Sequence, residues 1–284
     1  MKAAPFDYQS PRDLMEALQI LNSVEDSRVL AGGQTLVPMM AYRMVRPTVL
    51  VDINHLKELN YCTARDGHLA IGALTRHRNF QSGTSNGVLG ALLAAVVQHI
   101  AHVPIRARGT FCGSIAHADP ASEWCLTAVT LDGSVVLTGV NESRLLPASE
   151  FFEGFLSTAI QPGEIITEVR LPLLPDDAQF GFYEFSRRAG DYALAMSLAV
   201  LRLDGGRISE ARIGLGGVEG APRRISQVEE CLAGHEPSLA LIKASAKLAG
   251  ELVDPLEDSQ ADAPLRRDLT EAVVERALRK ALRL

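Results

Sequence analysis

The sequence is poor in cysteine and has no long apolar run. Its four cysteines, Cys62, Cys112, Cys125 and Cys231, are so far apart that no two fall within a dozen positions. This spacing excludes a local zinc motif and a cysteine cluster for iron–sulfur ligation. The start has no apolar segment of the signal-peptide kind, and no apolar run reaches membrane-spanning length. We therefore expect a cytoplasmic protein without a membrane span.

A surplus of positive charge is also missing. The net charge is -6, which argues against a nucleic-acid partner because such proteins usually carry a basic surface. At 284 residues and 47% hydrophobic composition, the chain is long enough for two globular domains.

The familiar nucleotide-binding loops, G-x-G-x-x-G and the P-loop, are absent around the first glycine-rich stretch. This stretch contains Gly32-Gly33, which follows the apolar Val29-Leu30 and precedes an expected helix. Paired glycines allow positive φ angles and offer bare N–H groups to a phosphate. A plain turn explains the same residues, so this stretch predicts a phosphate site only together with a second loop of its kind.

Residues 108–124 could supply that second loop. Small residues permit close backbone approach, the hydroxyls of Thr110 and Ser114 can donate to phosphate oxygens, and Asp119 and Glu123 can accept from sugar hydroxyls. A buried turn followed by a capped helix is the structural alternative.

The N-terminal segment predicts a β-α-β unit that surrounds the first glycine loop. A short strand over 6–8 precedes a helix that Ser10 would cap, with Pro11 in the first turn. The apolar runs 29–31 and 49–53 are the next strands.

Further along, 88–100 is apolar on nearly every side and predicts a core helix. A metal site is suggested by four residues in and after this helix: His99, His102, Cys112 and His117. However, histidine is favoured electrostatically at the C-terminal ends of helices, and the spacing of the four residues does not place them in one coordination shell. We therefore expect no metal.

The C-terminal third predicts a separate unit after the proline-punctuated linker 172–177. Residues 192–203 and 208–215 flank Asp204-Gly205-Gly206-Arg207, a turn suited to an antiparallel hairpin. The glycines at 214–220 fit a strand end and turn better than a nucleotide loop. Helices are expected over 239–252 and 270–284, the last one solvated or facing another subunit.

Two motifs carry a resemblance to a known family: Ala-Gly-Gly-Gln-Thr-Leu-Val-Pro-Met-Met at 31–40 and Gly-Thr-Phe-Cys-Gly-Ser-Ile-Ala-His-Ala-Asp-Pro-Ala-Ser-Glu at 109–123. They resemble the FAD-binding medium subunit of the molybdenum hydroxylases, a family that includes molybdenum-type carbon monoxide dehydrogenase and, as a fused domain, xanthine dehydrogenase. Further stretches match in the same order, at 151–154, 162–166, 171–172, 186–193 and 213–218.

The resemblance implies an α+β fold. A two-subdomain FAD-binding domain of the PCMH type would span 1–174, with subdomains of about 1–56 and 57–174. A smaller C-terminal α+β domain with an antiparallel sheet and helices would span 175–284.

It also implies the residues that hold the cofactor. The two glycine-containing loops would cradle the FAD pyrophosphate, Glu123 would contact the polyol region, Ile165 or Ile166 would make an aliphatic contact, and Tyr192 would lie near the isoalloxazine ring. The complete predicted set is Ala31, Gly32, Gly33, Gln34, Thr35, Thr110, Phe111, Cys112, Gly113, Ser114, Glu123, Ile165, Ile166 and Tyr192. No residue is predicted to be catalytic.

Two positions depart from the family pattern. Cys112 stands where relatives usually have the first glycine of Thr-x-Gly-Gly, so a Cβ must fit the backbone angles of the loop. Glu184 stands where many relatives carry a lysine, which removes one positive contact to the flavin.

The resemblance implies an electron-transfer subunit. Electrons would come from a molybdopterin-bearing large subunit through the 2Fe-2S clusters of a small subunit to FAD, and from there to NAD, a quinone or oxygen. The chain has no cluster ligands of its own, so molybdenum cofactor and clusters are expected only on partners. Two alternatives stay open: a self-sufficient FAD-dependent oxidoreductase, and a non-enzymatic docking subunit that has lost FAD.

Overall fold

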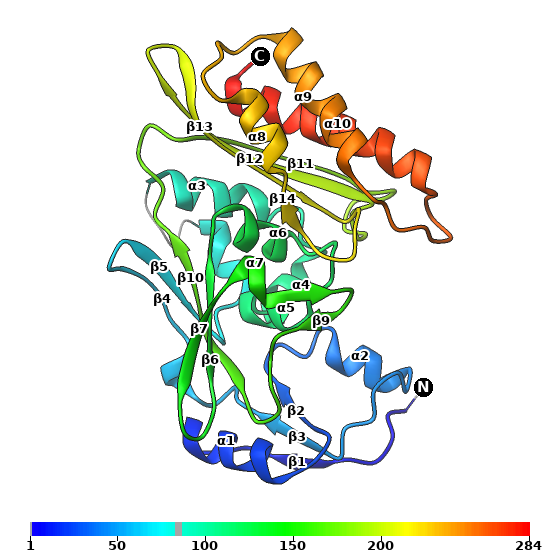
Figure 1. Cartoon of the computed structure of the whole chain (residues 1–284). Helices are drawn as coiled ribbons and strands as arrows, with labels where there is room; N and C mark the ends of the chain where they lie inside the picture. Colours follow the sequence, from blue (N-terminus) through cyan, green and yellow to red (C-terminus); the bar gives the residue numbers. More distant parts are fainter. Residues whose placement is uncertain (1, 83–86) are drawn as a thin grey trace.

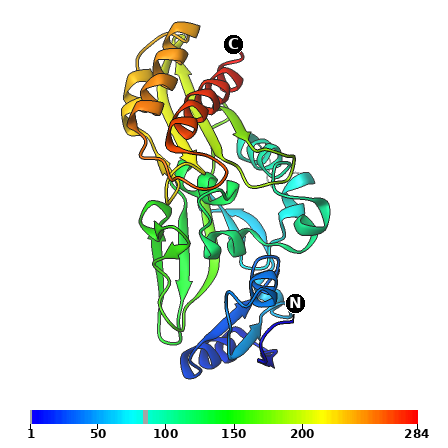
Figure 2. The same cartoon turned by 90° about the vertical axis from the view of Figure 1, so that its right-hand side faces the viewer.

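The computed structural model describes residues 2–82 and 87–284. In Figure 1 the chain runs from an N-terminal unit at the bottom, through a middle unit, to a C-terminal sheet and its helices at the top. The turned view in Figure 2 keeps the same order of units along the long axis.

The N-terminal unit is a three-stranded parallel sheet in the order β1-β3-β2. Its elements are β1 (Asp7–Gln9), α1 (Leu14–Ser23), β2 (Ser27–Leu30), α2 (Leu36–Ala41) and β3 (Val49–Asp52). The expectation that Ser10 caps the first helix is wrong: Asp13 is the N-cap, and its carboxylate accepts from the N–H of Glu16 at 2.8 Å. The β-α-β unit itself is confirmed.

The middle unit is built on a five-stranded antiparallel sheet in the order β4-β5-β10-β6-β7. Its strands are β4 (Cys62–Arg65), β5 (His68–Gly72), β6 (Ser134–Thr138), β7 (Ser143–Pro147) and β10 (Ile165–Pro172), with the small hairpin β8 (Phe152–Gly154) and β9 (Ser157–Thr158). The helices are α3 (Gly87–Val96), α4 (Val103–Arg108), α5 (Phe111–His117), α6 (Glu123–Thr130) and α7 (Ala148–Phe151), besides the 3-10 turns Lys57–Leu59 and His77–Ser82.

Two sequence expectations for this unit need correction. The predicted core helix over 88–100 ends at Val96. The predicted second loop is helical over Phe111–His117, where the Thr110 hydroxyl accepts from the N–H of Gly113 and caps α5, and α6 begins at Glu123. The alternative of a capped helix thus describes this stretch better than a loop.

The C-terminal unit is a four-stranded antiparallel sheet in the order β11-β12-β13-β14, with three helices. Its elements are β11 (Gln179–Phe185), β12 (Ala195–Asp204), β13 (Arg207–Gly216), β14 (Arg223–Arg224), α8 (Ser226–Leu232), α9 (Leu239–Leu252) and α10 (Ala263–Leu282). The hairpin around Gly205 and Gly206 is confirmed, as is the strand end at Gly216. Helix α10 begins earlier than predicted, since Asp262 caps it.

Both faces of the C-terminal sheet are covered, as Figure 1 shows. One face packs with α8, α9 and α10 into a separate core, so the expected solvated last helix has a buried side with Val273, Val274 and Leu278. The other face joins the core of the middle unit, where a Cβ at Gly214 would lie 1.8 Å from the Thr130 hydroxyl. Glycine is required there for the sheet to touch α6. Among the described residues, no helix combines the length and apolarity needed to cross a membrane.

Candidate functional site

A cavity of about 1030 Å³ lies between the N-terminal unit and the middle unit, and it brings the two predicted motifs together. One wall is the end of β2 and the glycine loop, and the opposite wall is the start of α5. The predicted residues that line it are Ala31, Gly32, Gly33, Gln34, Thr35, Thr110, Cys112, Gly113, Ser114, Ile165 and Ile166. Phe111 does not line it: its side chain is fully buried in the core.

The glycine loop is pressed against the end of α4. A Cβ at Gly32 would lie 2.5 Å from the carbonyl oxygen of Arg108 and 2.8 Å from Cα of Gly109. Gly33 has a φ of +70°, a left-handed conformation that side chains disfavour. Within residues 2–82 and 87–284, the backbone N–H groups of 32–35 have no protein acceptor. The loop therefore presents a row of free donors to the cavity.

A polar clamp behind the loop fixes its position. The side-chain amide of Asn54 donates to the carbonyl of Ala31 at 2.8 Å and to Asp52 at 2.6 Å. Arg76 donates to the amide oxygen of Asn54 at 2.6 Å and also to the carbonyl of Arg108. Arg76 thus ties both walls together. This clamp was not predicted from the sequence, although Asp52-x-Asn54 at the end of a buried strand was an available signal.

Cys112 lies in the first turn of α5, outside the residues with positive φ. The Cβ at this position therefore causes no backbone strain, because the segment is helical. Its buried thiol lies 3.5 Å from the carbonyl oxygen of Ile71 on β5. Burial, and next the charge of Glu168, raise the pKa of the thiol far above its usual range. It stays protonated and contributes packing.

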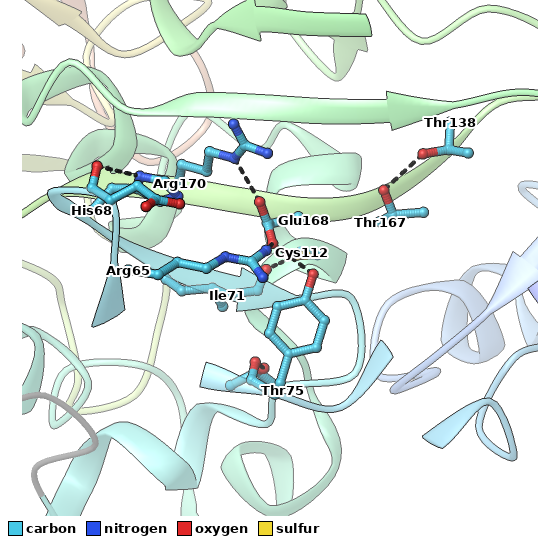
Figure 3. Close-up of polar contacts among 11 residues, drawn as sticks. Arg65, His68, Ile71, Thr75, Cys112, Thr138, Thr167, Glu168 and Arg170 are labelled. Carbon is cyan, nitrogen blue, oxygen red and sulfur yellow. Dashed lines mark hydrogen bonds and ion pairs between the residues drawn. The ribbon is translucent and has the colours of Figure 1, made fainter. Parts of the chain in front are cut away.

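Beside Cys112, a buried carboxylate joins strands β4 and β10, as Figure 3 shows. Glu168 accepts from the Tyr61 hydroxyl at 2.6 Å, from Arg170 at 2.6 Å and from Arg65. Burial alone would raise the pKa of Glu168, but these hydrogen bonds and the charges of the two arginines outweigh it and lower the pKa. The figure also shows the Thr138–Thr167 contact that links β6 to β10.

Ile165 and Ile166 begin β10, and the segment before them forms a further wall of the cavity. There Glu164 accepts two hydrogen bonds from Arg144, at 2.7 and 2.8 Å. Gly163 has a φ of +81° and packs against Asn22 of the N-terminal unit. The two isoleucines were predicted from the sequence, but the polar side chains that hold the turn were not.

The imidazole of His77 forms part of the cavity wall near Gly109. Its Nδ1 accepts a 2.9 Å hydrogen bond from the indole N–H of Trp124, a fully buried side chain. Burial, reinforced by the charges of Arg76 and Arg106, lowers the pKa of His77 to about 4. His77 is therefore neutral at pH 7, with its proton on Nε2.

Glu123 and Tyr192 lie outside the lining of this cavity. Glu123 begins α6, where Ser122 is the N-cap. Burial, and then the charge of Glu184, raise the pKa of Glu123 to about 8. Tyr192 lies in the loop after β11 and is 65% exposed. Desolvation by nearby residues, and next the charges of Asp119 and Glu123, raise the pKa of its hydroxyl. Both residues therefore lie away from the walls of this cavity.

Glu184, the second departure from the family pattern, lies on β11. Its Oε1 lies 3.3 Å from Nδ1 of His99, and its Oε2 has no partner among the described residues. His102 is elsewhere engaged, since its ring packs against Gly190. No group of three or more His, Cys, Asp or Glu side chains within the described ranges could hold a metal ion.

Comparison with known proteins gives a consistent result. Residues 4–174 match the FAD binding domain in molybdopterin dehydrogenase, and residues 180–281 match the CO dehydrogenase flavoprotein C-terminal domain. The 6-hydroxypseudooxynicotine dehydrogenase complex subunit alpha of Paenarthrobacter nicotinovorans is 37% identical over 284 residues, which cover 99% of this chain and 96% of the relative.

The nicotine 6-hydroxylase medium subunit of the same organism is 34% identical over 281 residues, 99% of each chain. The structure of carbon monoxide dehydrogenase from Hydrogenophaga pseudoflava superposes with a TM-score of 0.94 at 31% identity, covering 100% of this chain and 99% of the other. These matches confirm the predicted family resemblance and the α+β, PCMH-type fold.

Proposed function

The chain belongs to the family of FAD-binding medium subunits of molybdenum-containing hydroxylases and dehydrogenases, and we propose that it transfers electrons between a partner and an acceptor. In this proposal iron–sulfur clusters of a small subunit deliver electrons to FAD, and the FAD reduces NAD, a quinone or oxygen. The molybdenum cofactor is on a large subunit that chooses the substrate. The complex works in the cytoplasm.

The observation that supports FAD binding is the pair of walls around the 1030 Å³ cavity. One wall presents the free N–H groups of 32–35, and the other presents the hydroxyls of Thr110 and Ser114. Donors of this kind fit a pyrophosphate, and the close approach at Gly32 leaves no room for a side chain between the walls. The residues present therefore fit the cofactor.

Each part of the site has a proposed task. The loop 31–35 and the start of α5 hold the pyrophosphate, while Ile165 and Ile166 supply apolar contact. Glu123 and Tyr192, which lie away from the cavity walls, take the polyol and isoalloxazine end. When bound, FAD supplies the redox chemistry, and the chain binds and orients it.

We propose the domain boundary near residue 174, between the end of β10 at Pro172 and the start of β11 at Gln179. Residues 1–174 then form the FAD-binding domain, and its subdomains of about 1–56 and 57–174 both line the cofactor cavity. Residues 175–284 form the C-terminal domain, whose β11 brings Glu184 to the cofactor domain.

The deciding experiment is to express the chain alone with excess FAD. We expect a flavin spectrum and no reduction of the flavin by aldehydes, purines, N-heterocycles or carbon monoxide. Activity should return only when the small and large subunits are added, and the complex should survive size-exclusion chromatography because stable interfaces of this class commonly bury more than about 2,000 Å².

Two results would favour the alternatives. Rapid flavin reduction by substrate without partners would indicate a self-sufficient oxidoreductase. A colourless chain that still assembles with both partners would indicate a docking subunit. Cys112, where the sequence departs from the family's Thr-x-Gly-Gly pattern, is helical and unstrained, so this departure does not by itself favour the docking subunit.

A further inference from the structure

A buried arginine at the start of α10 joins two backbone segments of the C-terminal sheet. The side chain of Arg266 is only 5% exposed, and its Nη1 donates to the carbonyl of Leu194 at 2.7 Å and to that of Gly217 at 2.5 Å. Its Nη2 donates to Asp258 at 2.7 Å, while its buried Nε has no partner among the described residues. Leu194 ends the β11–β12 loop, residues 186–194, and Gly217 directly follows β13. One guanidinium therefore holds the ends of two separate segments together.

The β11–β12 loop is fixed at further points along its length. Arg187 donates to the carbonyl of Gln260, in the segment that leads into α10. Gly190 has a φ of +86° and lies so close to His102 that a Cβ would come within 2.4 Å of the imidazole ring. The loop is therefore held between the segment before α10 and the residue that precedes α4.

The second segment held by Arg266 reaches the turn before α6. The N–H of Gly217 donates to the carbonyl of Pro120 at 2.7 Å, and this turn leads directly to Glu123 at the start of α6. Gly217 has a φ of +76°, and a Cβ there would lie 3.0 Å from the carbonyl oxygen of Ala193 in the β11–β12 loop. Gly217 thus contacts both the turn before α6 and the loop, and Arg266 fixes it in this position.

An exposed aromatic side chain stands on this fixed loop. Tyr192 is 65% exposed, although the backbone beside it is held by a buried hydrogen bond. Surface loops are usually mobile, and a buried guanidinium with an unpaired Nε is weak as a source of stability, since packed apolar residues often do as well. What Arg266 adds is a defined position for the loop. An aromatic side chain held in one place is preorganised to contact another planar ring.

We propose that Arg266 is a positioning residue for the isoalloxazine end of the flavin site. It holds the loop of Tyr192 against the segment that leads to Glu123, so that both side chains meet the cofactor without reorganisation. This inference rests on the proposed function, in which these two residues take the isoalloxazine and polyol ends of FAD. Arg266 acts through Leu194 and Gly217 and contacts no reacting atom.

The position of the loop is tested on the full chain without FAD by amide hydrogen exchange. Arg266→Met keeps the length of the side chain and removes its donors, so the hydrogen-bonded N–H groups of Leu194 and Gly217 should exchange about 10-fold faster. Arg266→Lys, whose ammonium can still donate to a carbonyl, should show a smaller acceleration. Should Arg266→Met not fold, the comparison of Arg266→Lys with the parent decides.

Val273→Ala is the matched control for lost stability, because it trims a fully buried side chain of the same helix without touching either segment. It should leave the exchange of these two N–H groups unchanged under conditions where the chain stays folded. Exchange at Leu194 and Gly217 that is equal in the parent and in the arginine variant would overturn the proposal, as would the same acceleration in Val273→Ala.

The role toward the cofactor is tested on the FAD-loaded chain by the fluorescence per bound flavin, which a stacked tyrosine quenches. Tyr192→Ala should raise it, and Arg266→Met should raise it toward the same level while FAD content is retained. In the double variant the arginine change should add nothing, because it acts through the tyrosine. Additive effects, or parent-like fluorescence in either single variant, would overturn the role. A parent chain that holds no FAD would instead refute the proposed function, and the exchange measurement would still report on the loop.

Discussion

The indole N–H of Trp124 donates a 2.9 Å hydrogen bond to Nδ1 of His77. This bond joins the start of α6 to the turn that forms the cavity wall, 47 residues earlier. Because Nδ1 is the acceptor, the neutral ring carries its proton on Nε2, next to Gly109. The aromatic pair thus fixes the tautomer and the position of a side chain in the proposed cofactor site.

We predict that His77→Phe destabilises the chain by about 1–3 kcal/mol, because the buried indole N–H loses its acceptor. Urea denaturation measures this loss, and Trp124, the single tryptophan, reports it by fluorescence. The folded-state pKa of His77 is lowered to about 4 from 6.5, so the parent loses stability as the pH falls from 6.5 to 4. The stability of His77→Phe should not fall in this way between pH 6.5 and pH 4.

His235→Phe is the matched control, since that residue is exposed and its ring hydrogen-bonds, among the described residues, to the carbonyl of Ala233. Equal stability of the parent and His77→Phe, with the same acid dependence, would contradict the structural role of the Trp124–His77 bond.

A second prediction concerns the close approach of the two cavity walls. Gly32→Ala places a Cβ 2.5 Å from the Arg108 carbonyl, so the loop must move away and the FAD affinity should fall by about 100-fold, or roughly 3 kcal/mol. Gly33→Asp should abolish FAD retention, since it combines a φ of +70° with a negative charge facing a phosphate. Flavin absorbance per polypeptide measures both.

Gly220→Ala is the control, because a Cβ there would meet only an ordinary contact at 3.6 Å, with the N of Phe155. Full flavin content in Gly33→Asp would show that the first loop does not hold the pyrophosphate.

The sequence predicted the elements whose signals are local. The hairpin around Gly205 follows from its turn residues, and the glycine loop follows from strand, Gly-Gly and helix in succession. The first cap was misassigned because Ser10 and Asp13 both suit an N-cap, and only the completed turn with Glu16 decides between them. The sequence alone does not show which of two neighbouring residues will cap a helix.

The parts of the site that were missed depend on contacts between distant segments. Arg76 donates to Asn54 and Arg108, which lie 22 and 32 residues away in the sequence. Neither hydrophobic periodicity nor a sequence motif predicts such a clamp. Glu184 meets His99 across the junction of two units. Its burial and missing partner can be seen only once β11 has packed against the segment after α3.

A third prediction addresses Cys112. Cys112→Gly should keep FAD at least as well as the parent, because the thiol faces the Ile71 carbonyl and glycine adds no bulk to the cavity wall. Stability should fall by about 1–3 kcal/mol, from the low helix propensity of glycine and the loss of a buried side chain. FAD content and urea denaturation separate the two effects.

Cys231→Gly, in α8 and only partly buried, is the control for a glycine in a helix, although it also removes the sulfur that accepts from Ser245 at 3.6 Å. A strong loss of flavin in Cys112→Gly would show that this thiol makes a specific contact with the cofactor.

The last prediction concerns Glu168. Glu168→Gln leaves Arg65 and Arg170 without a carboxylate, while the side chain itself is only 4% exposed. Loss of one partner of a buried ion pair costs about 3–5 kcal/mol, and the partial exposure of both arginines reduces this to roughly 2–3 kcal/mol. The pKa of Glu168 is lower in the folded state than in the unfolded chain. The stabilisation that its carboxylate provides is therefore complete above the unfolded-state pKa of Glu168 and is lost as the pH falls through its folded-state pKa.

The parent and Glu168→Gln should therefore differ most at neutral pH and converge in acid, as measured by urea denaturation at a series of pH values. Glu210→Gln removes an exposed partner of Arg202 and should change stability by less than about 1 kcal/mol at any pH. A difference between the parent and Glu168→Gln that stayed constant from neutral to acid pH would mean that the ionised carboxylate is not what joins β4 to β10.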